Sequence, residues 1–186
     1  ALSNLGMGYV FEELIRKFNE ENNEEAGEHF TPREVIELMT HLVFDPIKDR
    51  LPTVMTIYDP ACGSGGMLTE SQNFIEEKYP DPSTRRDVYL YGKEINDETY
   101  AICKSDMMIK GNNPAYIRPG STLSVDEFAG SRFDFMLSNP PYGKSWASEQ
   151  KFIKEGGDVI DPRFKVTLRD YWGNEEVQDA TPRSSD

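Results

Sequence analysis

The residues from Phe133 to Gly143, Phe-Asp-Phe-Met-Leu-Ser-Asn-Pro-Pro-Tyr-Gly, have the chemistry to grip a flat molecule that carries an amino group. An apolar run of strand length is followed by Pro140 and Pro141, which exclude both a helix and a central strand. The open chain leaves the Asn139 amide, the Pro140 carbonyl and the flat Tyr142 ring just past the strand end. An isolated Asn-Pro-Pro is more often a simple turn, so the rest of the sequence must decide between the two interpretations.

A second motif, Asp59-Pro-Ala-Cys-Gly-Ser-Gly-Gly66, lies between an expected strand and an expected helix. Glycines let a backbone approach a ligand closely, and a helix N-terminus offers free N–H groups. Gly63 and Gly65 begin a dinucleotide fingerprint, but Leu68 stands where its third glycine belongs, and no Gly-Lys-Ser/Thr ending completes a P-loop. Asp59 fits a cationic ligand better than a pyrophosphate. The alternative role of Asp59, capping the turn with its carboxylate, fits the local sequence equally well.

Glu94 follows the next expected strand. Open α/β sheets place a carboxylate at this position to accept both hydroxyls of a ribose, whereas the alternative is an ordinary surface glutamate. A ligand with a ribose, no phosphate and a positive charge is indicated. S-adenosylmethionine meets all three conditions.

Alternating strands and helices must position these motifs, which predicts a parallel sheet with helices on both faces. We expect strands over residues 54–58, 88–91, 116–118 and 133–137, and helices over residues 8–19, 67–78 and 97–109, the last capped by Asp97. A further helix starts with Thr31 as N-cap, Pro32 at its first position and Glu34 at its third, a capping box. Its expected core face consists of Val35, Leu38, Met39 and Leu42.

Beyond Gly143 the periodic pattern dissolves, and the chain from Gly173 looks unanchored. We therefore expect three parts: a helical lead-in over residues 1–30, a cofactor-binding and catalytic core over 31–143, and an irregular segment over 144–186 that contacts substrate or partners.

Composition sets limits on partners and location. The 186 residues suit one domain or a large piece of one, and 20 Lys+Arg against 33 Asp+Glu give a net charge of −13. That charge argues against holding nucleic acid by the overall electrostatic field of the chain, so a local basic patch or a basic partner is needed.

The sequence contains no long apolar run and no signal-like start that would indicate a membrane or secretory protein, which favours the cytoplasm. Two cysteines and two histidines do not make a zinc site, so no metal is expected. Cys62 and Cys103 are expected to be small buried residues.

The two motifs lie 80 residues apart from Asp59 to Asn139, and the segment Glu28-His-Phe-Thr-Pro-Arg-Glu34 precedes them. In this order the three resemble DNA adenine methyltransferases that act on the exocyclic amine, in particular the modification subunit of type I restriction–modification systems. The resemblance covers nearly the whole chain and implies an α/β, Rossmann-like, S-adenosylmethionine-dependent methyltransferase fold. Members are much longer and use seven strands, so it also implies an incomplete domain that is not active alone.

The resemblance carries roles to individual residues. The Thr-Pro helix start would bind the amino-acid end of the cofactor, Glu94 its ribose, and Ile95 its adenine ring. Ser121 stands where the family often has Asp or Asn, and a simple turn is an equal interpretation there. The implied cofactor residues are Glu28, Phe30, Thr31, Pro32, Asp59, Ala61, Gly63, Ser64, Gly65, Gly66, Glu94, Ile95 and Ser121.

The implied catalytic residues are Asn139, Pro140, Pro141 and Tyr142, and the expected nucleic-acid contacts are Tyr142, Lys144, Lys151 and Lys154. If Asn139 Oδ1 and the Pro140 carbonyl accept both N–H bonds of an aromatic amine, the nitrogen lone pair is aimed at the methyl sulfonium. Positioning then supplies much of the rate without a strong base. A base inside a duplex must be flipped out to reach this site, and it would stack on Tyr142. Double-stranded DNA and the specificity and restriction subunits are the expected partners.

Three alternatives remain open at this point. Asn-Pro-Pro-Tyr also serves enzymes that methylate a protein glutamine or an RNA amine, although the Thr-Pro segment favours DNA. A nicotinamide oxidoreductase is disfavoured by the missing third glycine. A non-catalytic interaction module of a restriction complex is the third.

Overall fold

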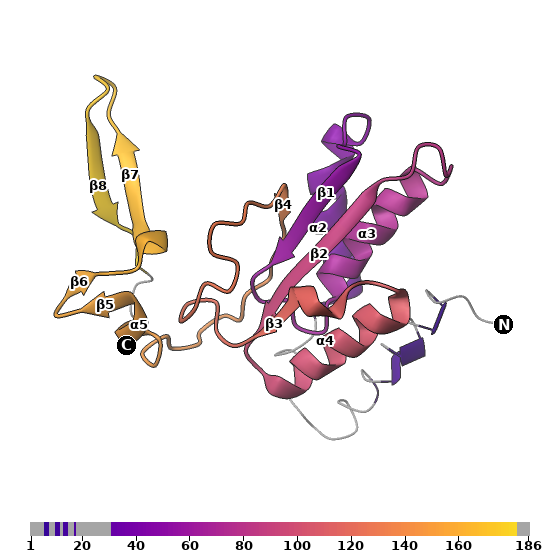
Figure 1. Ribbon diagram of the computed structural model, residues 1–186, viewed down its shortest axis with the longest axis horizontal. Helices are drawn as coiled ribbons and strands as arrows, with labels where there is room; N and C mark the ends of the chain where they lie inside the picture. Colours follow the sequence, from indigo (N-terminus) through magenta and orange to yellow (C-terminus); the bar gives the residue numbers. More distant parts are fainter. Residues whose placement is uncertain (1–5, 8–9, 12, 15–16, 18–30, 182–186) are drawn as a thin grey trace.

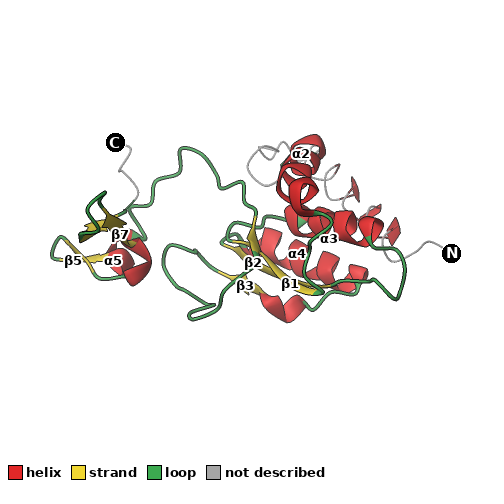
Figure 2. Cartoon of the chain, turned by 90° about the horizontal axis from the view of Figure 1, so that it is seen from above, coloured by secondary structure: helices red, strands yellow, loops and turns green. Residues whose placement is uncertain are grey.

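The computed structural model describes residues 6–7, 10–11, 13–14, 17 and 31–181 (Figure 1). A four-stranded sheet with three helices forms the main body (Figures 1 and 2). The C-terminal segment, residues 144–181, extends to one side of it and contacts it through Arg163. The main body contains α2 (Arg33–Phe44), β1 (Val54–Asp59), α3 (Gly66–Lys78), β2 (Asp87–Glu94), α4 (Asp97–Lys110), β3 (Ile117–Pro119) and β4 (Phe135–Met136). Short 3₁₀ helices cover Asp45–Ile47 and Pro114–Tyr116.

All neighbouring strands of this sheet run parallel, in the order β3-β2-β1-β4. The four strands predicted from the sequence are therefore confirmed, and the α/β class with them. β4 is shorter than the expected strand 133–137, although the Leu137 N–H still donates to the Tyr58 carbonyl at 3.2 Å.

The helix N-termini differ from the sequence prediction in two places. α2 begins at Arg33 with Pro32 as N-cap and no side-chain cap, so the predicted capping box with Thr31 and Glu34 is wrong. α4 is capped by Asn96 instead of Asp97, because the Asn96 side chain accepts a hydrogen bond from the Thr99 N–H at 2.9 Å. The predicted helix over residues 8–19 falls largely outside the described residues, and those described between 6 and 17 are helical.

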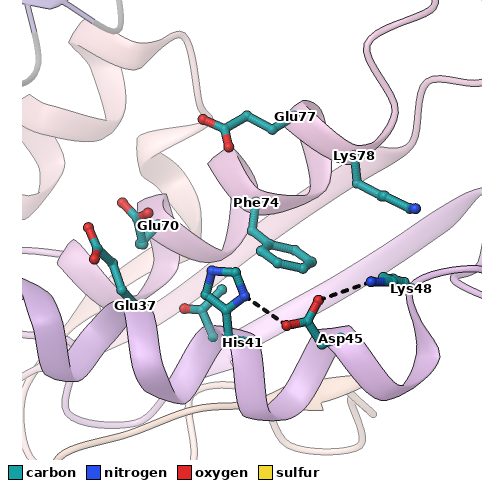
Figure 3. A pocket seen from close by; sticks show the side chains of 9 residues that line it. Glu37, His41, Asp45, Lys48, Glu70, Phe74, Glu77 and Lys78 are labelled. Carbon is teal, nitrogen blue, oxygen red and sulfur yellow. Dashed lines mark hydrogen bonds and ion pairs between the residues drawn. The ribbon is translucent and has the colours of Figure 1, made fainter.

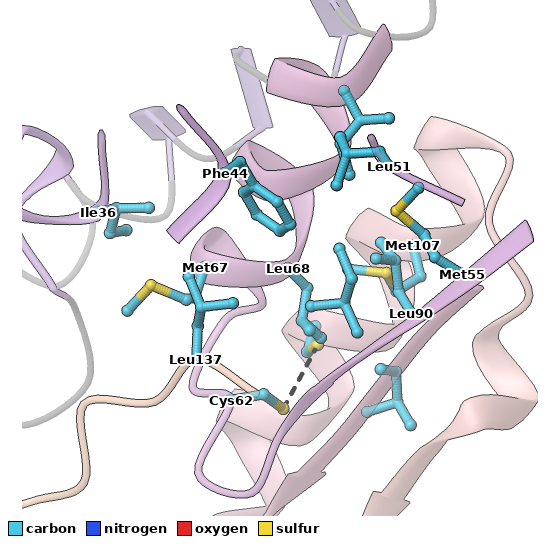
Figure 4. Packing of buried hydrophobic residues seen from close by; sticks show 14 residues of the cluster. Ile36, Phe44, Leu51, Met55, Cys62, Met67, Leu68, Leu90, Met107 and Leu137 are labelled. Carbon is cyan, nitrogen blue, oxygen red and sulfur yellow. Dashed lines mark hydrogen bonds between the residues drawn. The ribbon is translucent and has the colours of Figure 1, made fainter. Parts of the chain in front are cut away.

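The core lies between one face of the sheet and the three helices (Figure 4). Side chains alternate along a strand, so Met55 and Ile57 of β1 share a face with Leu90 of β2. These strand residues pack in one cluster with Ile36 and Phe44 of α2, Met67, Leu68 and Ile75 of α3, and Cys103 and Met107 of α4. The expectation of helices on both faces is therefore met on one face only within the described part of the chain.

The second face of the sheet carries an aromatic cluster in place of helices. Tyr58 stacks on Phe133 and Tyr91 stacks on Tyr116, each at 4.6 Å between ring centroids. Phe128 meets Tyr58 and Tyr91 edge to face, at 5.5 and 5.4 Å. The chain between β3 and β4 supplies Phe128 and Phe133, so this connection covers the face on which Tyr58 and Tyr91 lie.

α2 buries a different face from the one predicted. Val35, Leu38 and Leu42 are exposed, whereas Ile36, Thr40 and Phe44 are buried. The helical period is right, but α2 is rotated because the Phe44 ring fits between Phe74 and Phe135, with centroid distances of 5.8 and 4.9 Å.

The C-terminal segment has more regular structure than the sequence suggested. It contains α5 (Gln150–Ile153), β5 (Lys154–Glu155), β6 (Asp158–Val159), a 3₁₀ helix (Pro162–Phe164), β7 (Lys165–Arg169) and β8 (Glu175–Asp179). β5–β6 and β7–β8 are antiparallel hairpins. β7 carries a short alternation of polar and apolar residues, Lys-Val-Thr-Leu-Arg, which is typical of a strand but was not predicted as one. Every residue of β7 and β8 is exposed, so neither strand has a buried face. The Asp170 carboxylate holds the second turn by accepting from the Trp172 and Asn174 N–H groups.

Replacing Phe44 with Ala should lower the free energy of unfolding by about 3–5 kcal/mol, because the side chain is fully buried among two aromatic rings. Leu42→Ala on the same helix is the matched control and should change it by less than about 0.5 kcal/mol, since Leu42 is 66% exposed. Urea unfolding followed by circular dichroism measures both. A larger loss for Leu42→Ala than for Phe44→Ala would contradict this packing of α2.

Candidate active site

The sequence motifs meet at one edge of the sheet. Because all four strands are parallel, their carboxyl ends lie together, and open α/β sheets bind ligands beyond these ends. Asp59 ends β1 and Glu94 ends β2, while Ser121 and Asn139 lie two and three residues beyond β3 and β4.

The glycine loop is tied to β2 by its backbone. The Cys62 N–H donates to the Lys93 carbonyl at 2.9 Å, and the Gly63 N–H donates to Glu94 Oε2 at 2.9 Å. Gly65 has φ +93°, and a Cβ there would lie 2.9 Å from Cys103 Sγ and from Met107 Cε. Gly65 is thus needed both for its left-handed backbone and for the approach of the loop to α4.

Glu94 joins three elements through one buried carboxylate. Its Oε2 accepts from Gly63, and its Oε1 accepts from the Asn96 N–H, at 2.8 Å, just before α4. The residue is 9% exposed. Each carboxylate oxygen has a second lone pair, so both can still accept a hydroxyl of a ligand.

Asp59 is a buried acid beside this carboxylate. The pKa of Asp59 is raised from 3.8 to about 6 in total. Burial is the main cause, the Ala61 N–H that donates to Oδ1 at 3.0 Å opposes it, and the charge of Glu94 adds to it. A desolvated carboxylate next to a second one favours a cation nearby. The carboxyl edge therefore suits a positively charged ligand, as the sequence indicated.

The other predicted cofactor residues differ in their exposure and in their hydrogen bonds. Ile95 is 60% exposed, so its side chain is free to pack against a ligand. Ser64 is buried in the glycine loop, beside the partly buried Ala61. The Ser121 hydroxyl accepts from the Leu123 N–H at 3.2 Å, which is the local turn that was the alternative for this residue.

The structure brings two motifs together that are 108 residues apart. The Asn139 amide nitrogen donates to the Thr31 hydroxyl oxygen at 3.2 Å. The Thr31 hydroxyl therefore contacts Asn139 instead of capping α2 as predicted. Because the amide nitrogen is the donor in this bond, Asn139 Oδ1 can accept hydrogen bonds from a ligand. Pro140, Pro141 and Tyr142 are exposed, Tyr142 to 89%, so the loop presents its acceptors and its ring openly. This contact could not be predicted from either motif alone, because the two residues are 108 positions apart and only the tertiary fold brings them together.

The lysines predicted to contact nucleic acid lie in the C-terminal segment. Lys151 and Lys154 line one shallow hollow of about 340 Å³ with Ala147, Gln150 and Gly157. Lys144 is exposed in the loop that precedes the residues of this hollow. Glu28 and Phe30 lie outside the described residues.

A separate hollow of about 250 Å³ lies between α2 and α3 (Figure 3). There His41 Nδ1 lies 2.8 Å from Asp45 Oδ2, and the imidazole meets the Phe74 ring edge to face. None of the predicted site residues lines it.

Both cysteines are free and buried, as expected, with their Sγ atoms 3.9 Å apart. The hydrogen bond between the two thiols and their burial hold the pKa of Cys62 well above its usual value. Across the described residues no group of three or more His, Cys, Asp or Glu side chains is arranged to hold a metal ion. None of the described helices has the length and apolar character to span a membrane.

The sheet order, the glycine loop after β1 and the acid at the end of β2 define a Rossmann-like methyltransferase fold. A structure assigned as a class I S-adenosylmethionine-dependent methyltransferase from Listeria monocytogenes shares this fold with a TM-score of 0.60, at 18% identity over 74% of this chain and 39% of that one. The model of the N-6 DNA methylase family matches residues 3–172. The chain therefore belongs to the N-6 DNA methylase family.

Among its relatives is the methylase subunit of the type I restriction enzyme MpnII from Mycoplasma pneumoniae, 32% identical over 85% of this chain. The MjaIX methylase subunit from Methanocaldococcus jannaschii is 28% identical over 91% of it. This chain spans only 28% and 26% of those two proteins. A solved type I restriction–modification methyltransferase subunit from Streptococcus thermophilus aligns over 69% of this chain and 26% of that one, with a TM-score of 0.53 and 25% identity.

The raised pKa of Asp59 predicts a pH-dependent stability. Between about pH 4 and the folded-state value of about 6 the folded chain holds more protons than the unfolded chain. The contribution of Asp59 to the free energy of unfolding should therefore fall as the pH rises through this window, by up to about 3 kcal/mol, and then level off.

Asp59→Asn should remove that fall and increase the free energy of unfolding near neutral pH. Urea unfolding at about pH 5 and about pH 7.5 measures the difference. Asp87→Asn, which changes an exposed carboxylate, is the control and should keep the wild-type profile. Identical profiles for wild type and Asp59→Asn would show that the carboxylate is not desolvated as described.

Proposed function

We propose that this chain provides the cofactor-binding and catalytic core of a DNA adenine methyltransferase that uses S-adenosylmethionine within a type I restriction–modification system. The single observation that carries the proposal is the Asn139–Thr31 hydrogen bond, which joins the Asn-Pro-Pro-Tyr loop to the start of α2 at the carboxyl edge of the sheet. Membership of the N-6 DNA methylase family supports the choice of an amine as the methyl acceptor.

The residues at the carboxyl edge fit the proposed cofactor. Asp59 offers a buried carboxylate to a cation, and Glu94 retains lone pairs for ribose hydroxyls. Ile95 offers an exposed apolar surface to an adenine ring. When bound, the cofactor would supply an electrophilic methyl group on a sulfonium.

The loop after β4 would orient the methyl acceptor. Asn139 Oδ1 and the Pro140 carbonyl would accept the two N–H bonds of the target amine and hold its lone pair toward the methyl group. Thr31 would keep the Asn139 amide in the orientation that presents Oδ1. Tyr142, 89% exposed, would stack on a base taken out of the duplex.

The C-terminal segment would meet the DNA backbone. Lys151 and Lys154 share one hollow and Lys144 precedes it, so the three would form a local basic region on a chain with a net charge of −13. Most of the DNA-binding surface would come from a specificity subunit, with a restriction subunit as the further partner. The relatives named as type I methylase subunits support this assignment.

Asn139→Ala should reduce methyl transfer from labelled S-adenosylmethionine to DNA by about 100-fold or more in the assembled complex, because one of two acceptors that orient the amine is lost. Cofactor binding should be retained, which shows that the variant is folded. Methylation at the wild-type rate would rule out the catalytic role of Asn139.

Tyr142→Ala should weaken methyl transfer by about tenfold, since a stacking ring is lost, whereas Tyr142→Phe keeps the ring and should stay near wild type. The assay should include DNA, RNA and protein substrates in parallel. Label on protein or RNA alone would identify a different substrate class and refute the DNA assignment.

A further inference from the structure

The loop Ser121–Val125, just beyond β3, is held by its carbonyls. Lys93 Nζ donates to the Ser121 carbonyl at 3.2 Å and also to the Val125 carbonyl. Arg163 Nη1 donates to the Thr122 carbonyl at 2.6 Å, and its Nη2 donates to the Leu123 carbonyl at 3.3 Å. Four of the five carbonyls in this loop therefore accept hydrogen bonds from two cationic side chains.

Lys93 approaches the loop from the sheet. It precedes Glu94 in β2, so the two side chains point to opposite faces. Lys93 is 2% exposed, and burial lowers the pKa of its ammonium group, while the charge of Glu127 raises it. The loop carbonyls replace the water that a buried ammonium group has lost, so Lys93 and the loop depend on each other.

Arg163 approaches the loop from the C-terminal segment. Its guanidinium is fixed by Asp161, with Nε 3.1 Å from both carboxylate oxygens and Nη2 2.6 Å from Oδ2. Asp161 is itself held, because its Oδ1 accepts from the Arg163 N–H at 2.9 Å. A planar guanidinium can bind a carboxylate on one edge and two carbonyls on the other, which an ammonium group cannot.

The same loop contacts both other walls of the candidate site. The Gly120 N–H, immediately before it, donates to the Glu94 backbone carbonyl at 2.8 Å. The Thr122 hydroxyl donates to the Pro60 carbonyl in the glycine loop. A shift of the Ser121–Val125 loop would therefore disturb contacts to Glu94 and to the residue that follows Asp59.

We propose that Arg163, oriented by Asp161, is a positioning residue that fixes the Ser121–Val125 loop as a wall of the cofactor site. For its effect on the cofactor this inference rests on the proposed function. It also connects the C-terminal segment, which carries the candidate DNA-contacting lysines, to the cofactor site through one side chain. Since coupling between two sites is reciprocal, bound cofactor should in turn protect the Asp161–Phe164 backbone.

Arg163→Ala should raise amide hydrogen exchange in the loop by about tenfold and weaken S-adenosylmethionine binding by about five- to tenfold, because charge-assisted hydrogen bonds to two carbonyls are lost. Exchange in β1 should stay unchanged, which separates a local effect from general destabilisation. Arg163→Lys keeps the charge but not the fork and should fall between wild type and Arg163→Ala. Arg169→Ala is the control: this arginine pairs with Glu175 on the β7–β8 hairpin and is 69% exposed, so neither quantity should change.

Hydrogen exchange by mass spectrometry on the full chain, with and without S-adenosylmethionine, and calorimetric titration provide both readouts. Loop exchange in Arg163→Ala equal to that in wild type would overturn the inference, whatever happens to the cofactor. Absence of cofactor binding by the assembled wild-type complex would instead refute the proposed function, and faster loop exchange in Arg163→Ala would still support the positioning contact. If Arg163→Ala does not fold, Arg163→Lys and Asp161→Asn decide by the same comparison of loop and β1 exchange.

Discussion

The carboxylate of Glu94 is the interaction on which the candidate site depends. It accepts N–H groups from Gly63 and Asn96, and so holds the glycine loop and the start of α4 against the end of β2. The backbone of the same residue accepts from Gly120 beyond β3. One buried acid therefore sets the relative position of three connections at the carboxyl edge, and Asp59 adds a second buried carboxylate to the same region.

Contacts within one motif could be predicted from the sequence, and contacts between distant motifs could not. The strand, glycine loop and helix from Val54 to Lys78 follow from local residue types, and the structure confirms them. The Asn139–Thr31 bond and the Gly63–Glu94 bond depend on tertiary packing, which brings residues 108 and 31 positions apart into contact. Thr31 was predicted to be a helix cap because its local sequence fits one, whereas in the structure its hydroxyl accepts a hydrogen bond from Asn139.

The same distinction explains the other corrections. Periodicity identified α2, but several apolar faces fit a helical period, and only the contacts of Phe44 with Phe74 and Phe135 select the buried one. The β7–β8 hairpin was not predicted, because the alternation in β7 is only five residues long and β8 contains a single apolar residue, Val177. Lys93 and Arg163 carried no recognisable motif, since their partners are backbone carbonyls that any sequence supplies.

Under the proposed function, the carboxyl edge binds S-adenosylmethionine or its demethylated product through Glu94. Calorimetric titration of the demethylated product into wild type, Glu94→Gln and the neighbouring control Glu98→Gln tests it most directly. Glu94→Gln should bind at least about tenfold more weakly, because a neutral amide cannot accept both N–H groups and still receive the ligand hydroxyls. Glu98→Gln should match wild type. Equal affinities for wild type and Glu94→Gln would show that Glu94 does not hold the ligand.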